Sequence, residues 1–399
     1  MDLDYRPDAP RALEGVRVLD ISRLVAGNAI SHVLADHGAE VVKVEDPVEG
    51  DALRHWAAAG VACSWKVYAR NKKSISLNLR SEKGRAVLLD LLPTAQVLIE
   101  NFKAGALERM GLGPDIMLAR NPKLIVARVS GYGQTGPYAH KPGFGTLVEA
   151  MSGFAYKNGF PDKPPALPPL ALADMVAGLY GAFGVMVALR EVELKGGEGQ
   201  VIDLSLLEPV VSILGPDAAI HSATGTVPAR LGNASNTTSP RNAYRTKDGE
   251  WIAMSGSMQS MAMRIFRTIG RADMCDDPRY NTQAARSANR EEVDAVVGGF
   301  IAERTLAEAM EVFEREGVTA GPIYSAAQLK EDRHAQERGV IVNLPDGELG
   351  RLPMHNVIPR LSGTPGAIRT PAPEIGAHNE EILGGLGLDL DRLKEEGTI

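Results

Sequence analysis

Short runs of β-branched and aliphatic residues alternate with helical patterns through the first half of this 399-residue chain. Each short run predicts a buried strand, and the alternation predicts βαβ units joined into a mostly parallel sheet. We expect strands at residues 16–21, 40–45, 74–79, 96–100 and 124–130, with helices at 27–37 and 82–92 between them. The predicted fold class is α/β, with a doubly wound, Rossmann-like sheet that binds ligands beyond the carboxyl ends of its strands.

The pattern divides the chain into two lobes. A proline-rich stretch at 161–169 leads into a long apolar helical pattern at 171–194, which stops before Gly196. The polar stretch 225–240 then precedes a β-hairpin pattern near 244–254 and further helical patterns. We expect residues 1–224 to form the N-terminal part of a large domain, 225–330 a second, smaller α/β domain, and 331–399 a segment that returns to the large domain.

Composition excludes several kinds of partner. A net charge of −7 leaves no general basic field, so we expect no nucleic-acid partner and no membrane partner held by charge. No uninterrupted apolar run approaches the roughly 18 residues of a membrane span, and residues 1–5 lack the apolar core of a signal peptide. Cys63 and Cys275 suggest neither a disulfide framework nor a zinc site, so we expect a cytoplasmic protein.

A glycine-rich motif, GYGQTG at 131–136, directly follows the strand predicted at 124–130. A dinucleotide site also needs a helix that opens inside the glycine run. Pro137 and Pro142 follow instead, which favours a tight loop that lets backbone approach a ligand over a nicotinamide or flavin site. Walker A, HExxH, GxSxG and CxxC spacings are also absent from the sequence, so we expect no metal site and no permanently bound cofactor.

Basic and polar stretches lie at the ends of the predicted strands, at 70–73, 77–80 and 100–103, with Arg109 a few residues further on. A parallel sheet gathers strand ends at one edge, where their cations can together bind an anion such as the phosphates of a nucleotide-like cofactor. Taken singly, each stretch is better explained as a solvated surface. Taken together, the stretches support an anion site and a solvated surface equally.

Asp174 is the most informative single residue, because it lies at the start of the long apolar helical pattern. An acid in the first turn of a helix can simply complement the helix dipole. A carboxylate delivered rigidly among apolar neighbours and loop glycines also suits a nucleophile or a base. The pattern alone gives these two interpretations equal weight.

Seven segments together resemble the family III CoA-transferases, which include the α-methylacyl-CoA racemases, and the likeness covers nearly the whole chain. They are 13–20 (LEGVRVLD), 34–45 (LADHGAEVVKVE), 71–75 (NKKSI), 100–102 (ENF), 130–137 (SGYGQTGP), 150–153 (AMSG) and 172–174 (LAD). The resemblance implies a large doubly wound domain built from both chain ends, a small second domain and an interlocked homodimer. It also implies that Asp174 is the nucleophile, which forms first a mixed anhydride and then an aspartyl-CoA thioester.

The same resemblance implies coenzyme A thioesters as substrates and a set of CoA contacts. By position in the family's motifs these are Val25, Ala26, Leu77, Asn78, Arg80, Asn101, Phe102, Lys103, Arg109 and Lys141. The cationic members would hold the ADP phosphates while the pantetheine arm runs toward Asp174.

Departures from the family's patterns narrow the activity. Racemases carry a Gly-His-Asp stretch where this chain has Gly143, Phe144 and Gly145, and a phenyl ring cannot remove a proton from the carbon alpha to a thioester. Gly145 replaces an acidic residue of the formyl-CoA:oxalate transferases and Val25 replaces a glutamine, and their glycine-rich lid has no counterpart near 232–240. Oxalate and formate are therefore disfavoured as substrates.

The preferred hypothesis is a CoA-transferase that moves CoA from an acyl-CoA donor, succinyl-CoA being one candidate, to a carboxylic acid. A dicarboxylate such as succinate, malate or a methylated relative is the preferred acceptor. Two alternatives remain: an acyl-CoA racemase or epimerase, and a CoA-binding protein without turnover in which Asp174 only complements the helix dipole.

Overall fold

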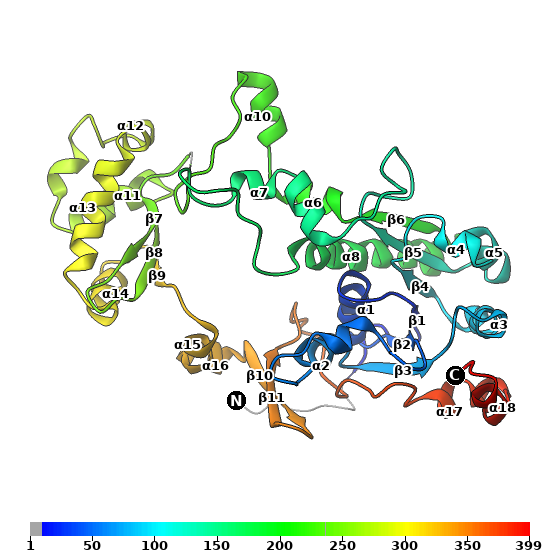
Figure 1. Ribbon diagram of the computed structural model, residues 1–399. Helices are drawn as coiled ribbons and strands as arrows, with labels where there is room; N and C mark the ends of the chain where they lie inside the picture. The colour runs from blue at the N-terminus through cyan, green and yellow to red at the C-terminus, as the bar shows by residue number, and fades with distance from the viewer. Residues whose placement is uncertain (1–9, 236) are drawn as a thin grey trace. The chain divides into compact units, whose positions relative to one another are not determined.

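The computed structural model describes residues 10–235 and 237–399, and the chain divides into two compact units (Figure 1). The large unit contains Met1–Phe154, Leu167–Pro216 and Gln336–Ile399, and the small unit contains Ala155–Ala166 and Asp217–Ala335. The sequence analysis expects domain boundaries at 224/225 and 330/331, and the structure has them at 216/217 and 335/336. The structure also groups 155–166 with the small unit, whereas the sequence analysis places these residues in the N-terminal part of the large domain.

The large unit is built on a six-stranded sheet in the order β3-β2-β1-β4-β5-β6, and every neighbouring pair is parallel. The strands are β1 (Arg17–Asp20), β2 (Glu40–Glu45), β3 (Lys72–Ser76), β4 (Val97–Glu100), β5 (Ile125–Ser130) and β6 (Val201–Ser205). The strand order reverses between β1 and β4, where doubly wound sheets bind ligands. The predicted α/β fold class is confirmed.

Helices cover both faces of this sheet. One core cluster joins the sheet to α1 (Ala26–Asp36) and α8 (Leu172–Lys195), and the other joins it to α3 (Glu82–Leu91), α4 (Ala106–Arg109), α5 (Pro114–Arg120) and α17 (Asn379–Ile382). The helices α1 and α8 cross closely: a Cβ on Gly178 would lie 2.4 Å from the Cβ of Ala29. Glycine at the crossing therefore allows α8 to reach the sheet beside α1.

The remaining elements of the large unit include a C-terminal hairpin, which shows that the end of the chain belongs to this unit. They are α2 (Cys63–Tyr68), α6 (Gly145–Met151), α9 (Leu207–Ile213), β10 (Ile341–Asp346), β11 (Gly350–His355) and α18 (Leu390–Glu395), with α7 (Phe154–Lys157) and α16 (Arg333–Arg338) at the junctions between the units.

The small unit packs its helices on an antiparallel sheet in the order β7-β8-β9. Its elements are α10 (Asp217–Thr224), β7 (Arg241–Arg245), β8 (Trp251–Ser255), α11 (Gln259–Thr268), α12 (Gln283–Ala288), α13 (Arg290–Ala302), α14 (Leu306–Arg315), β9 (Ala320–Pro322) and α15 (Ala326–Glu331). Phe266 and Phe313 are fully buried in its core. The unit thus has a hydrophobic core of its own.

Two local expectations were wrong for identifiable reasons. The third strand begins two residues earlier than expected, because Lys72 pairs with Val41 of β2 and extends the ladder. The sequence also predicts one continuous helix over 206–222, but the structure interrupts it between α9 and α10, where Gly215 has a positive φ of 80° and Pro216 has no N–H for a helical hydrogen bond.

Among the described residues, α8 is the one helix long and apolar enough to cross a membrane by length and composition. Of its most apolar 18-residue window, 44% is buried within the structure. Its inward residues, including Ala177, Gly181 and Val185, pack against the core, which accounts for that side of the helix. Its outward side keeps large apolar residues exposed, a feature that burial in the core does not explain.

Candidate active site

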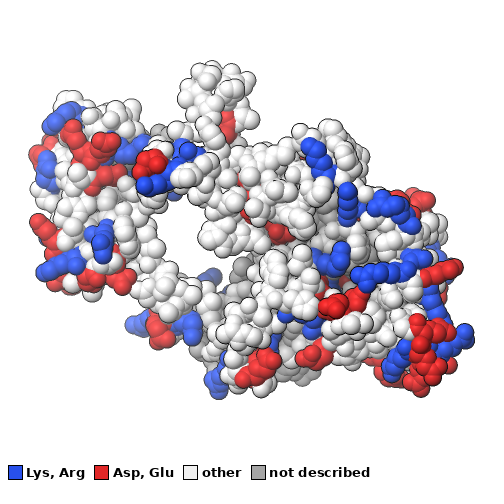
Figure 2. All heavy atoms as spheres, in the orientation of Figure 1, with Lys and Arg blue, Asp and Glu red and all other residues white. Residues whose placement is uncertain are grey.

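A cavity of about 450 Å³ lies at the point where the strand order reverses, within the large unit. Its wall combines the loop after β1, the loop after β4, the end of β5 and the start of α8. The lining includes Arg23, Leu24, Ala26, Asn101, Phe102, Lys103, Ser130, Lys141, Phe144 and Asp174. Figure 2 shows basic side chains on the large unit around the place where β5 and α4 lie in Figure 1.

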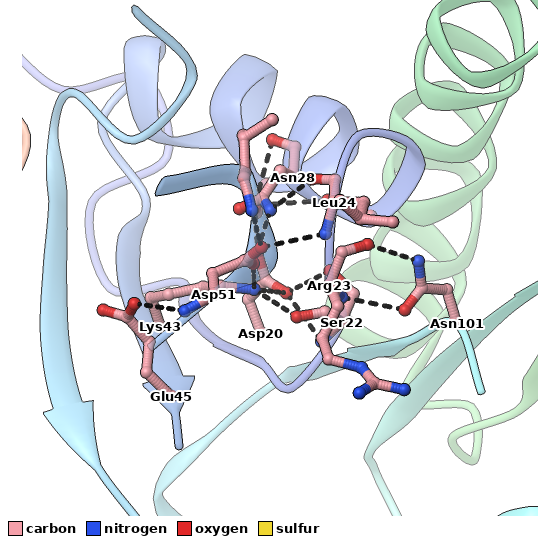
Figure 3. A network of polar contacts seen from close by, with 12 residues as sticks. Asp20, Ser22, Arg23, Leu24, Asn28, Lys43, Glu45, Asp51 and Asn101 are labelled. Carbon is pink, nitrogen blue, oxygen red and sulfur yellow. Dashed lines mark hydrogen bonds and ion pairs between the residues drawn. The ribbon is translucent and has the colours of Figure 1, made fainter. Parts of the chain in front are cut away.

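The loop after β1 holds a backbone conformation that leucine rarely adopts: Leu24 has a φ of 63°. The carboxylate of Asp51 accepts a hydrogen bond from the N–H of Leu24 at 2.9 Å, and the side chain of Asn28 donates to its carbonyl at 2.5 Å (Figure 3). A left-handed leucine costs roughly 1–2 kcal/mol, so the surrounding bonds fix a strained loop in the wall of the cavity.

Asn101 ties the loop after β4 to the loop after β1. Its Oδ1 accepts from the N–H of Arg23 at 2.8 Å, and its Nδ2 donates to the carbonyl of Arg23 at 2.6 Å. These two bonds join both sides of the cavity across the strand-order reversal. The shape of the cavity is therefore set before any ligand binds.

Buried charges support these loops from below (Figure 3). The ammonium group of Lys43 lies 3.2 Å from Asp20 and 2.9 Å from Asp51, and all three side chains are fully or almost fully buried. Burial alone would raise the pKa of Asp20, but the charges of Lys43 and Lys72, with hydrogen bonds from serine hydroxyls, lower it to about 2. Burial lowers the pKa of Lys72 to about 8. The network is balanced, so loss of one member leaves a buried charge uncompensated.

Asp174 reaches the cavity from the first turn of α8. Burial raises its pKa to about 6, and the nearby carboxylate of Glu149 contributes in the same direction. A Cβ on Gly145 would lie 2.5 Å from Oδ2 of Asp174, so the carboxylate packs directly against the start of α6. A carboxylate with a raised pKa is more basic, and thus more nucleophilic, than an ordinary aspartate.

Two further polar groups at this site were not anticipated from the sequence. Glu149 is 3% exposed and accepts a hydrogen bond from the N–H of Ala173 at 3.0 Å. The hydroxyl of Ser130 is buried, has no partner within the described structure, and belongs to a residue that lines the cavity. A lone carboxylate in the apolar run 147–151 was the available signal for Glu149, whereas nothing local distinguished Ser130.

A second cavity of about 470 Å³ lies beside the first, over the ends of β1, β2 and β3. Arg23, Ala52 and Phe102 line both cavities. The two cavities therefore adjoin, with Arg80 in the wall of the second and Asp174 in the wall of the first.

The structure gathers most of the expected site residues around these two cavities. Asp174, Ala26, Asn101, Phe102, Lys103 and Lys141 line the first, and Leu77, Arg80 and Phe102 line the second. Val25, Asn78 and Arg109 line neither. Val25 is a buried N-cap of α1, Asn78 bonds the backbone near Thr398, and the guanidinium of Arg109 lies against Gly105. The role of each in CoA binding stays a prediction.

The expectation that 70–73 contributes to an anion site at the ligand edge was wrong. These residues lead into β3, which begins at Lys72, and the beginnings of parallel strands lie at the edge opposite the carboxyl ends. Arg70 pairs with Asp36 at 2.6 Å, and Lys73 pairs with Glu40 at 2.6 Å. The cations of this stretch are therefore used within the fold.

The glycine-rich loop at 131–136 has the form expected of a tight turn. Gly133 and Gly136 have positive φ angles of 90° and 84°, and the carboxylate of Asp203 accepts from the N–H of Gln134 at 3.0 Å. The next helix, α6, begins only at Gly145. The loop thus lacks the helix of a dinucleotide fingerprint. Across residues 10–235 and 237–399, no group of three or more His, Cys, Asp or Glu side chains could hold a metal ion.

Known proteins resemble this chain over most of its length. The model of the family described as CoA-transferase family III matches residues 13–379. The chain is 39% identical to the succinyl-CoA:D-citramalate CoA-transferase of Chloroflexus aurantiacus, with 96% of each chain covered. It is 34% identical to the succinate:glutarate CoA-transferase of Agrobacterium fabrum, with 95% of this chain and 97% of that protein covered.

Solved structures also resemble this chain over most of its length. A crystal structure of a CaiB/BaiF family protein from Brucella suis matches with a TM-score of 0.83 at 30% identity, and 94% of this chain and 100% of that chain are covered. The likeness in sequence and the likeness in fold therefore extend over the same large share of the molecule.

Proposed function

This chain belongs to CoA-transferase family III, and from that premise we propose that it moves CoA from succinyl-CoA to a dicarboxylic acid through covalent intermediates on Asp174. The observation that carries the proposal is the position of Asp174. Its carboxylate, with a raised pKa, lies in the cavity at the strand-order reversal, beside loops that the structure holds rigidly.

The chemistry follows from a carboxylate at this place. Asp174 attacks the thioester carbonyl of the donor, and the C–S bond breaks to release CoA thiolate and leave a mixed anhydride. The thiolate then attacks the aspartyl carbonyl, which expels the donor carboxylate and forms an aspartyl-CoA thioester. The acceptor carboxylate repeats the first step on that thioester, and the thiolate finally attacks the acceptor carbonyl and frees Asp174.

Each attack places negative charge on a carbonyl oxygen, which needs donors nearby. The helix α1 begins at the cavity wall with Ala26, and no side chain caps its first turn. Its N-terminal N–H groups are therefore candidates for stabilising the oxyanion. The orphaned hydroxyl of Ser130 is a second candidate donor in the same wall.

The choice of substrates rests on the relatives and on local charge. The two curated relatives above carry succinyl-CoA or succinate in their names, with citramalate and glutarate as the other acids. Arg23, Lys103 and Lys141 line the cavity that contains Asp174. Cations here suit the free carboxylate of a dicarboxylic acid as well as the phosphates of CoA. We also propose that the protein carries out this transfer without a permanently bound cofactor.

We also propose that the protein works as an interlocked homodimer. The outward side of α8 exposes Leu179, Phe183, Val187 and Leu194, with Phe183 68% exposed. A second copy of the chain would cover this exposed apolar side of α8.

The racemase alternative finds no histidine base in this cavity. Phe144 lines it and is 65% exposed, and no histidine lies among its lining residues. The direct test is to incubate the purified protein with succinyl-CoA and a panel of mono- and dicarboxylic acids, and to read new thioesters by mass spectrometry. Transfer to dicarboxylates is expected. Exchange of the α-proton in deuterium oxide without any acceptor acid would favour racemisation, and no turnover of any acyl-CoA would favour a binding protein.

A further inference from the structure

Glu149 lies beside Asp174 but comes from a different helix. It belongs to the second turn of α6, is 3% exposed, and its Oε1 accepts the N–H of Ala173, the residue directly before Asp174. The N-cap of α8 is Ala171, whose side chain cannot accept a hydrogen bond. Glu149 therefore supplies from α6 a cap that α8 lacks.

Capping alone does not account for a glutamate at this position. A glutamine could accept the same hydrogen bond without a charge, and a buried charge is costly unless it is paired. Among the described residues, Glu149 has no Lys, Arg or His within ion-pair distance. The basic residues of the cavity wall, Arg23, Lys103 and Lys141, are exposed to solvent. The negative charge of Glu149 is thus left to act on its neighbour.

That neighbour is Asp174, and the two carboxylates raise each other's energy when both are ionised. Attack of Asp174 on a thioester converts its carboxylate into a neutral anhydride, and the following step gives a neutral thioester. Each conversion removes one of the two adjacent charges. The repulsion in the resting enzyme is therefore released when the covalent bond forms.

We propose that Glu149 is a positioning residue for Asp174: its hydrogen bond to Ala173 fixes the first turn of α8, and its buried charge keeps the carboxylate of Asp174 reactive. The inference rests on the proposed role of Asp174 as nucleophile. Burial and the Glu149 charge act in the same direction on the pKa of Asp174, which is raised to about 6. The exposed cations of the wall are not among the causes of this shift, and solvent screens their charges.

The test compares the wild type with Glu149→Gln, which keeps an oxygen to accept the Ala173 N–H and removes the charge. We expect the acidic limb of kcat to move to lower pH by about one unit, and kcat at the optimum to fall roughly tenfold. KM for succinyl-CoA should stay close to wild type, and the thermal midpoint should not fall, because the repulsion between the two carboxylates is removed while the hydrogen bond to Ala173 is kept. Glu191→Gln, at the other end of α8, is the matched control and should change neither kcat nor its acidic pH limb.

Glu149→Ala removes both the charge and the hydrogen bond, and should lower the thermal midpoint as well as kcat. If it does not fold, the Glu149→Gln comparison still decides the matter. An unchanged kcat and an unchanged pH limb in Glu149→Gln would overturn the proposal and leave Glu149 as a helix cap only.

A second measurement does not depend on turnover. The carboxyl carbons of ¹³C-labelled aspartates are titrated by NMR in the protein without substrate, and the Asp174 signal is identified by its loss in Asp174→Asn. The Asp174 midpoint should lie near 6 in the wild type and lower in Glu149→Gln. Identical midpoints would overturn the inference. Failure of the wild type to transfer CoA would instead contradict the proposed function.

Discussion

The Oδ2 of Asp174 lies 2.5 Å from the place that a Cβ on Gly145 would occupy. The carboxylate fits against the start of α6 only because residue 145 has no side chain. The absence of a Cβ at one position thus sets where the reactive oxygen of another residue can lie.

Gly145→Ala should displace the carboxylate of Asp174 without unfolding the protein. A shift of about 1 Å at a reacting group can cost roughly 100-fold in rate, so we expect kcat to fall by about that factor while the circular dichroism spectrum is retained. Thr146→Ala, at the next and exposed position of α6, is the control and should keep full activity. Full activity in Gly145→Ala would show that the close approach does not matter to the reaction.

The rate of acyl transfer should depend on pH through Asp174. The carboxylate must be ionised to attack, and its pKa is raised to about 6 by burial and by Glu149. We therefore expect kcat to rise with pH through about 6 and then to level off, measured with succinyl-CoA over a range in which the protein stays folded. A rate that is already at its plateau at pH 5 would contradict the raised pKa.

Ionised Asp174 should also destabilise the fold. Its pKa is higher in the folded chain than its usual value of 3.8, so its favourable contribution to stability is present below that value and is lost as pH rises through about 6. At pH 8 the cost reaches up to about 3 kcal/mol. Asp174→Asn should therefore raise the thermal midpoint at pH 8 and much less at pH 4.

The control for that comparison is Asp115→Asn, because Asp115 is a first-turn acid of α5 that is exposed to solvent. It should not stabilise the protein at either pH. A destabilised Asp174→Asn at pH 8 would show that the carboxylate is held favourably in its ionised form.

Lys43→Met should be strongly destabilising, because it removes the cation that pairs with Asp51 and one of the two that pair with Asp20, Lys72 being the other at 3.6 Å. Breaking a buried pair from one side costs about 3–5 kcal/mol. Lys66→Met removes a partly exposed pair with Asp346 and should cost under about 1 kcal/mol. Urea denaturation of both variants measures the difference, and equal losses would mean that the buried network adds nothing beyond a surface ion pair.

The exposed side of α8 should be covered by a second copy of the chain. Phe183→Glu places a charge on that side at a position that is 68% exposed within one chain, so the fold of the single chain should survive. We expect a dimer for the wild type and a shift toward monomer for Phe183→Glu, measured by light scattering after gel filtration. Ile116→Glu, which adds the same single negative charge at a 41% exposed position of α5, controls for the change in charge. A wild type that is monomeric at all concentrations would contradict the dimer.

Much of the large unit was predictable because its strands are short apolar runs and its helices have local signals. The hydroxyl of Ser81 caps α3 by accepting from the N–H of Gly84, and Gly196 ends α8 in a left-handed conformation. The ion pairs of Arg70 and Lys73 were not predictable, because their partners Asp36 and Glu40 come from other elements.

The same reason explains what was missed at the site. Asp174 could be singled out because a charged residue in an apolar helix is visible along the chain. The contacts of Glu149 with Ala173, and of Gly145 with Asp174, join α6 to α8 and exist only after the chain has folded. Sequence patterns report local propensity, whereas the pKa of a carboxylate depends on what packs around it.

The central claim is that Asp174 becomes covalently acylated, and trapping tests it most directly. The protein is incubated with succinyl-CoA, treated with hydroxylamine, digested and analysed by mass spectrometry. The account predicts a hydroxamate on Asp174 in the wild type, and no trapped residue and no transfer in Asp174→Asn. Undiminished transfer by Asp174→Asn, or a hydroxamate on another carboxylate such as Glu149, would contradict it.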